Sequence, residues 1–305
     1  MLDQHPEVLC HGEGRFFGRD DKDLNYENVQ VNKKGQLLRP GSLHYTLTQC
    51  EDLRAWMERT WWSRDAEAER HIVHLTREAV LYFLLHKRAR IGKKIVGDKT
   101  PLHSTATLGE IGTMFPEAKV VHIIRDGRDQ AVSHNHHRWN RVPTVEEGGR
   151  LTLEEQDKRD RYREDPEGFL ASGESIFSED YLVAAATGWS SKVGAAHREG
   201  SSALGDRYTE VYDENLLEHP KNEMTRLFRF LGAVDDERMV HECVESNRFE
   251  KVARRQAGSE DSASFLRKGV AGDWRNVFTE RDKSIYKEFA GDLLSDLNYE
   301  QDAKW

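Results

Sequence analysis

The residues best suited to chemistry are two groups of basic side chains that lie far apart in the sequence. The first runs from Arg125 to Asp129, after an apolar stretch and before Ser133. The planar guanidinium of an arginine can bind a phosphate through two hydrogen bonds, and a serine hydroxyl near a helix N-terminus adds another donor. Arg125 and Ser133 could therefore hold a terminal phosphate. The alternative is a turn between a strand and a helix with surface ion pairs only.

The second group lies near the C-terminus, where Arg267, Lys268 and Gly269 precede Gly272 and Trp274. Adjacent cations attract an anion, and glycines let the backbone approach it closely. We expect the two cations to close over a phosphate, with the tryptophan anchoring the loop in the core. A polar loop beside a core tryptophan is the alternative.

Short β-branched runs predict the elements that position these groups. Strands are expected at 94–97, 119–124 and 207–212, and helices at 72–84, 104–114 and 220–231. The helix at 72–84 is expected to bury a face that includes Leu75 and Phe83. Alternating strands and helices predict an α/β fold with a parallel sheet, whose ligands bind where strands end and helices begin.

Length and composition set the remaining limits. The 305 residues suit a single domain over 1–305, with 139–178 as a probable insertion or lid. The formal net charge of −9 argues against nucleic acid as a partner. Three scattered cysteines and the lack of a long apolar run predict a cytoplasmic protein without a membrane span.

Two motifs in this order resemble the sulfotransferase superfamily. Val121 to Ser133 is similar to its 3'-phosphate motif, and Phe265 to Phe278 is similar to the C-terminal donor-binding motif of the cytosolic members. The resemblance spans almost the whole chain. It implies a P-loop NTPase-like parallel sheet flanked by helices. It also implies transfer of a sulfuryl group from 3'-phosphoadenosine-5'-phosphosulfate to a hydroxyl or amine acceptor, leaving adenosine 3',5'-bisphosphate, without a metal.

The resemblance assigns donor-binding roles to six residues. Two bind the 3'-phosphate, three form a loop that closes over it, and one contacts the adenosine. They are Arg125 and Ser133, then Arg267, Lys268 and Gly269, and finally Tyr212. For Tyr212 the alternative is a tyrosine at a strand end with its ring in the core and its hydroxyl in water.

The first residues are similar to the protein-tyrosine sulfotransferases and their bacterial relatives. Leu2 to Val8 and the Glu13-Gly14-Arg15 element carry this resemblance. It implies that Glu13 is the general base and that Arg15 orients Glu13 or an acidic acceptor. The residues before Pro6 look like the last turn of a helix. In those enzymes a glycine-rich phosphosulfate loop precedes the matching helix. We therefore expect the fold to lack its first strand and that loop, through a start codon placed too far downstream or a truncation.

Lys99 follows a predicted strand, so its ammonium is expected at the sheet edge, where it could stabilise the bridging oxygen of the donor. Cytosolic members have a histidine base after this Lys-Thr pair, whereas this chain has Pro101. His103 is the runner-up base and His11 a weaker one. The alternatives are a surface ion pair for Glu13 and Arg15 and a turn cation for Lys99.

Other functions remain open at this point. A nucleotide-dependent phosphotransferase would need a lysine-bearing phosphate loop and a magnesium site, and the sequence has neither. A catalytically inactive nucleotide-binding protein of the same fold is the second alternative. For the histidines at 134, 136 and 137 the alternative is a solvated face without a metal, and their spacing does not match a closed zinc set with cysteines. The acceptor and the oligomeric state are undecided.

Overall fold

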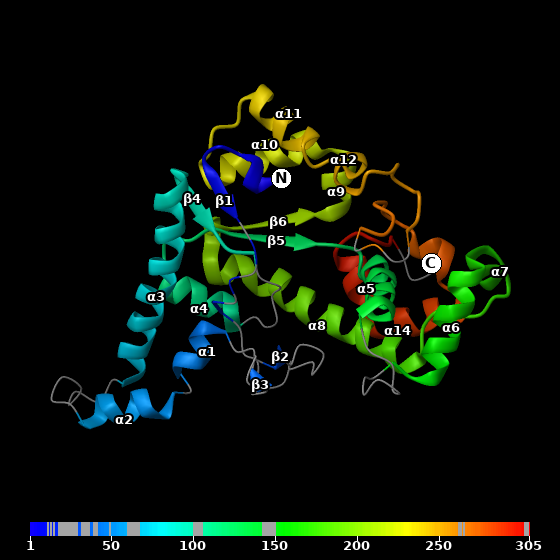
Figure 1. Cartoon of the computed structure of the whole chain (residues 1–305), viewed down its shortest axis with the longest axis horizontal. Helices are drawn as coiled ribbons and strands as arrows, with labels where there is room; N and C mark the ends of the chain where they lie inside the picture. The colour runs from blue at the N-terminus through cyan, green and yellow to red at the C-terminus, as the bar shows by residue number, and fades with distance from the viewer. Residues whose placement is uncertain are drawn as a thin grey trace. The chain divides into compact units, whose positions relative to one another are not determined.

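A computed structural model describes residues 1–10, 12, 14, 16–17, 30–31, 37–38, 42–48, 50–59, 68–99, 106–141, 151–261, 264, 266–301 and 305 (Figure 1). The chain divides into two compact units, each made of several stretches. Unit 1 comprises Met1–His122, Ala195–Thr209 and Met224–Val244, and unit 2 comprises Ile123–Gly194, Glu210–Glu223 and Glu245–Trp305. The single domain over 1–305 stays a prediction.

The described strands form three two-stranded sheets. β1 (Val8–Cys10) pairs in parallel with β4 (Ile95–Gly97), with Val8 opposite Ile95. β5 (Val120–Ile124) pairs with β6 (Tyr208–Tyr212), and both arrows point the same way in Figure 1. β2 (Gln30–Val31) and β3 (Leu37–Leu38) are antiparallel. Parallel pairs between helices confirm the predicted α/β class, and the three expected strands lie within a residue of their predicted bounds.

In the described part of unit 1, buried apolar residues form two small clusters. One contains Val80, Met114 and Phe115, and the other contains Leu108, Leu204 and Tyr208 among its buried residues. Its elements are η1 (Leu2–Gln4), α1 (Leu43–Thr48), α2 (Glu51–Arg59), α3 (Ala68–Ile91), α4 (Ala106–Met114), η5 (Gly205–Arg207) and most of α10 (Pro220–Leu231) and α11 (Glu237–Glu245).

Helix α3 differs from its expected pattern. Leu75 and Phe83 were predicted on the buried face, but they are 44% and 53% exposed. The residues that are buried are Ile72, Thr76 and Val80, four positions apart on one narrow stripe. Apolar periodicity at three- and four-residue steps therefore overestimated the width of the buried face.

Unit 2 holds the larger core and both predicted phosphate-binding segments. Ile124, Val132, Trp189, Trp274 and Tyr286 are buried together in it. Its helices are α5 (Gly127–Arg141), α6 (Leu153–Glu164), α7 (Pro166–Ala171), most of α8 (Glu179–Leu204), α9 (Asp213–Glu218), α12 (Phe249–Ala253), α13 (Trp274–Val277) and α14 (Glu280–Asp296).

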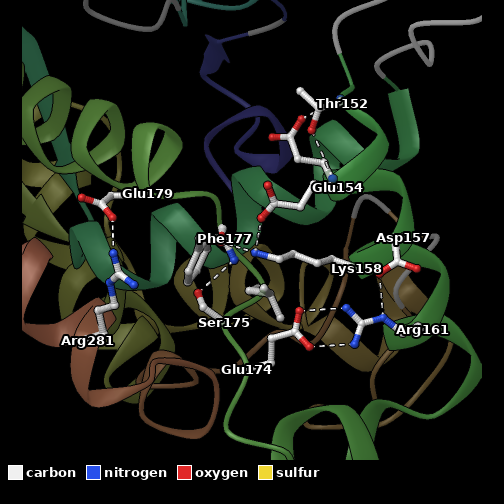
Figure 2. A network of polar contacts seen from close by, with 12 residues as sticks. Thr152, Glu154, Asp157, Lys158, Arg161, Glu174, Ser175, Phe177, Glu179 and Arg281 are labelled. Atoms are coloured by element: carbon white, nitrogen blue, oxygen red, sulfur yellow. Dashed lines mark hydrogen bonds and ion pairs between the residues drawn. The ribbon is translucent and has the colours of Figure 1, made fainter.

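Within the expected insertion, the stretch 151–178 contains α6 and α7 and contributes buried side chains to unit 2. Tyr162 and Phe169 belong to the core cluster. Lys158 donates from Nζ to the carbonyl oxygen of Phe177 over 2.9 Å (Figure 2). Arg161 binds Glu174 through both carboxylate oxygens, at 2.7 and 2.8 Å. These contacts fasten the stretch after α7 to α6, while a role as a lid stays a prediction.

Among the described residues, no helix combines the length and the apolar character that crossing a bilayer requires.

Candidate functional site

The turn between β5 and α5 is held by three contacts within unit 2. Trp189 donates from Nε1 to the carbonyl oxygen of Arg125 over 3.0 Å, and the N–H of Asp126 donates to Oε1 of Glu214 over 2.8 Å. A Cβ on Gly127 would lie 2.2 Å from the Tyr286 hydroxyl oxygen. Only glycine fits such a close approach. The backbone that carries Arg125 is thus firmly placed.

The side chain of Arg125 is 37% exposed, so its guanidinium can meet a ligand. Its Nε lies 3.5 Å from Oδ2 of Asp213, at the start of α9. A phosphate bound by Arg125 would compete with this carboxylate. Ser133 is half-buried and is the seventh residue of α5. The unpaired N–H groups that attract anions lie in the first turn of a helix, so Ser133 lies beyond them.

Arg128, three residues after Arg125, is completely buried. It donates from Nε and Nη2 to both carboxylate oxygens of Asp126, at 2.7 to 3.2 Å, and also binds Glu300. Its guanidinium carbon lies 3.7 Å from the ring centre of Trp274. Arg128 is therefore committed to internal partners, and of the two arginines in this run Arg125 is the one placed to bind a ligand.

The two basic segments meet at Asp129. Its carboxylate accepts from the N–H of Gly272 over 2.6 Å and from the N–H of Trp274 over 2.9 Å. Asp129 lies in the first turn of α5, and Trp274 begins α13. The loop that contains Arg267 and Lys268 is therefore attached to the helix that contains Ser133.

Arg267 and Lys268 share two carboxylates. Arg267 binds Asp273 and lies 3.0 Å from Glu260, whereas Lys268 lies 2.7 Å from Asp273 and 3.7 Å from Glu260. Burial alone would raise the pKa of Asp273, but hydrogen bonds from Arg267 and Lys268 lower it to about 2. Asp273 is thus ionised at neutral pH.

Gly269 has a backbone φ of +68°, which side-chain-bearing residues rarely adopt. A Cβ here would also lie 2.2 Å from the ring of Phe249. Its predicted place in a tight closing loop agrees with this requirement for glycine.

Tyr212 ends β6 and is half-buried against the unit 2 core. Its ring centre lies 5.9 Å from that of Tyr299. Burial and the neighbouring Glu210 and Glu214 raise the pKa of its hydroxyl. These contacts fit the strand-end alternative, and a contact to adenosine stays a prediction.

The alternative of a solvated histidine face does not hold for His136, which is 2% exposed. Its ring contacts Trp139 and Tyr162, with ring centres 5.1 Å apart in each case. Burial, reinforced by the charge of Arg267, lowers its pKa to about 3. His136 is thus a neutral core residue. In the part of the chain that the structure describes, no cluster of histidine, cysteine or acidic side chains is arranged to hold a metal ion.

The predicted catalytic residues are described only in part. Lys99 is exposed, follows β4 in unit 1, and its backbone N–H donates to the carbonyl oxygen of Gly12 over 3.3 Å. Glu13, Arg15, Pro101, His103 and His11 lie outside the described residues. Their roles stay predictions.

Sequence reasoning missed the carboxylates of this site. Asp129 and Asp273 were each part of a quoted motif, yet only their basic neighbours were given roles. The available signal was the alternation of acids with arginines and lysines in both segments. Glu260 had no such signal, because it lies seven positions before Arg267.

Part of the chain is similar to curated sulfotransferases. Human sulfotransferase 1C2 is 29% identical over 107 residues, covering 30% of this chain and 36% of the relative. Dog sulfotransferase 1B1 is 30% identical over 99 residues, covering 28% of this chain and 33% of the relative. The matches thus span about a third of the length of these curated relatives.

Among solved structures, mouse sulfotransferase SULT7A1 complexed with PAP aligns with a TM-score of 0.45 and 18% identity. This alignment covers 70% of this chain and 71% of the mouse protein. The model of the Sulfotransferase family matches residues 1–237, which is more than half of the sequence. The chain therefore belongs to the sulfotransferase family.

Proposed function

We propose that this protein transfers a sulfuryl group from 3'-phosphoadenosine-5'-phosphosulfate to a hydroxyl or amine acceptor and releases adenosine 3',5'-bisphosphate. Family membership supports the reaction class. The observation that supports this donor most directly is the junction at Asp129. It joins the Arg125 to Ser133 segment and the Arg267 to Gly269 loop within one unit.

In this proposal Arg125 and Ser133 bind the 3'-phosphate of the nucleotide. Arg267 and Lys268 close over it, and Gly269 lets the backbone approach. A dianionic phosphate would replace Asp213 beside Arg125 and compete with Glu260 for Arg267 and Lys268. Because a phosphate offers more acceptor oxygens than one carboxylate, the exchange favours the ligand when its geometry is bidentate.

Transfer itself needs an acceptor oxygen or nitrogen that attacks sulfur while the bond from sulfur to the 5'-phosphate oxygen breaks. The acceptor's proton passes to a base, for which Glu13 is the first candidate and His103 the second. Lys99 is the candidate for stabilising the charge that develops on the leaving phosphate oxygen. Arg15 would orient the base or an acidic acceptor.

The experiment is an activity screen with donor labelled in its sulfuryl group. A panel of phenols, sterols, amines, saccharides and tyrosine peptides is incubated with the protein, produced with any residues that the gene encodes upstream of Met1, and transfer of label is measured. We expect at least one acceptor class to become labelled, and the Lys99→Ala variant to lower turnover by about tenfold or more. If the nucleotide binds but no acceptor is labelled, the chain is a nucleotide-binding protein of the same fold.

A further inference from the structure

We infer that Asp129 is a positioning residue that aligns the two phosphate-binding segments of the donor site. This inference rests on the proposed function. Nothing in the comparisons assigns a role to this side chain. It contacts no proposed ligand, and acts through the loop that carries Arg267 and Lys268.

The Asp129 side chain, on α5, binds the backbone of the loop that follows Lys268. Both of its carboxylate oxygens accept from backbone N–H groups, one from Gly272 over 2.6 Å and one from Trp274 over 2.9 Å. The side chain is 2% exposed, so water does not compete for these bonds. Its place in the first turn of α5 favours a negative charge, because the helix dipole is positive there.

The two amides that Asp129 binds flank Asp273. Asp273 in turn binds Lys268 over 2.7 Å and also binds Arg267. A continuous series of polar contacts therefore leads from α5 to both cations of the loop. Gly272, with φ of +78°, gives the backbone the bend that presents both amides to one carboxylate.

An apolar residue at this position would avoid burying a charge, but it would leave the amides of Gly272 and Trp274 without an acceptor. Burial raises the pKa of Asp129, and the two amide hydrogen bonds only partly oppose this effect. A buried carboxylate is thus held at a cost to the folded state. What it supplies is a pair of acceptors with the spacing of amides 272 and 274, which no uncharged side chain reproduces.

The test is Asp129→Asn. Asparagine keeps the size but has one oxygen acceptor, and its NH2 group would face a backbone N–H. We expect faster hydrogen exchange in peptides that cover 266–275. We also expect calorimetry to show affinity for adenosine 3',5'-bisphosphate about tenfold weaker or more. Asp180→Asn is the matched control, because Asp180 also lies in the first turn of a helix but is exposed. It should change neither measurement.

A double-mutant cycle separates positioning from general stability. In a Lys268→Met background, the loss of affinity caused by Asp129→Asn should shrink, because one cation that Asp129 places is already gone. A general loss of stability would lower affinity by the same factor in both backgrounds. Equal effects in both backgrounds would overturn the inference.

The wild-type protein provides a test that does not depend on folding of the variant. The amides of Gly272 and Trp274 should exchange slowly compared with unbonded loop amides, and rapid exchange would overturn the positioning role. If the wild type failed to bind adenosine 3',5'-bisphosphate, the proposed function would be contradicted. The exchange data would still decide whether Asp129 holds the loop.

Discussion

Glu260 and Asp273 determine how available the loop cations are to a ligand. Asp273 is 3% exposed and also receives a hydrogen bond from Asn276 over 3.2 Å, so it is part of the loop's own structure. Glu260 is different, because besides the two cations it contacts the Tyr162 hydroxyl, which donates a hydrogen bond to it over 3.2 Å. It occupies a position on Arg267 and Lys268 that a phosphate would also need.

We therefore expect Glu260→Gln to tighten binding of adenosine 3',5'-bisphosphate by about three- to tenfold, since one competing negative charge is removed while size is kept. Calorimetry measures this directly. Glu164→Gln makes the same change in net charge at an exposed position of α6 and should leave the affinity unchanged. Weaker binding in the Glu260 variant would show that this carboxylate supports the loop instead of competing with the ligand.

At this scale the sequence indicated which cations are candidate phosphate ligands, but not which carboxylates they bind within the protein. Arg125, Arg267 and Lys268 were recognisable from residue type and motif. Arg128 is also an arginine and lies only three positions after Arg125, yet it is buried between Asp126, Glu300 and two tryptophans. Which arginine faces solvent depends on distant residues, so a local pattern could not decide it.

The element on which the site depends most is the start of α5. Gly127 is its first residue, and the rings of Trp189 and Tyr286 fill the space where a side chain would be. Trp189 also holds the carbonyl of Arg125. A side chain at position 127 would therefore disturb both the core of unit 2 and the backbone of Arg125, which is proposed to bind the phosphate.

We expect Gly127→Ala to lower the free energy of unfolding by about 1–3 kcal/mol, as overpacking does, because its Cβ would lie 2.4 Å from the Trp189 ring. Urea denaturation measures the change. Gly188→Ala is the matched control, since Gly188 lies within α8 with no neighbour within 4 Å of the added Cβ. It should be neutral or stabilise by about 0.5–1 kcal/mol. Equal stability of both variants would contradict the packing described at the turn.

Strands and helices were predicted well where apolar residues recur over a long stretch, as at 119–124 and 220–231. The segment from 151 to 178 was harder, because charged residues dominate it. Its helices are placed by specific polar contacts, such as Lys158 with the Phe177 carbonyl and the Thr152 capping box. Hydrophobic periodicity does not report such contacts.

For the whole molecule, the α/β class followed from the order of strands and helices, whereas the division of the sheet did not. The described strands pair in twos, and β4 is half-buried along its length. Pairing depends on long-range contacts that one sequence does not reveal. The net charge of −9 likewise does not reveal that Arg267 and Lys268 lie together beside Glu260 and Asp273.

The most direct test of this account compares two nucleotides by calorimetry. Adenosine 3',5'-bisphosphate and adenosine 5'-monophosphate differ only in the 3'-phosphate that the joined segments are proposed to bind. We predict that the wild type binds the bisphosphate at least about a hundredfold more tightly. Arg125→Ala should remove most of that difference, whereas Arg281→Ala, at an exposed position of α14, should retain it. Equal affinity of the wild type for both nucleotides would contradict the assignment of a 3'-phosphate site to these segments.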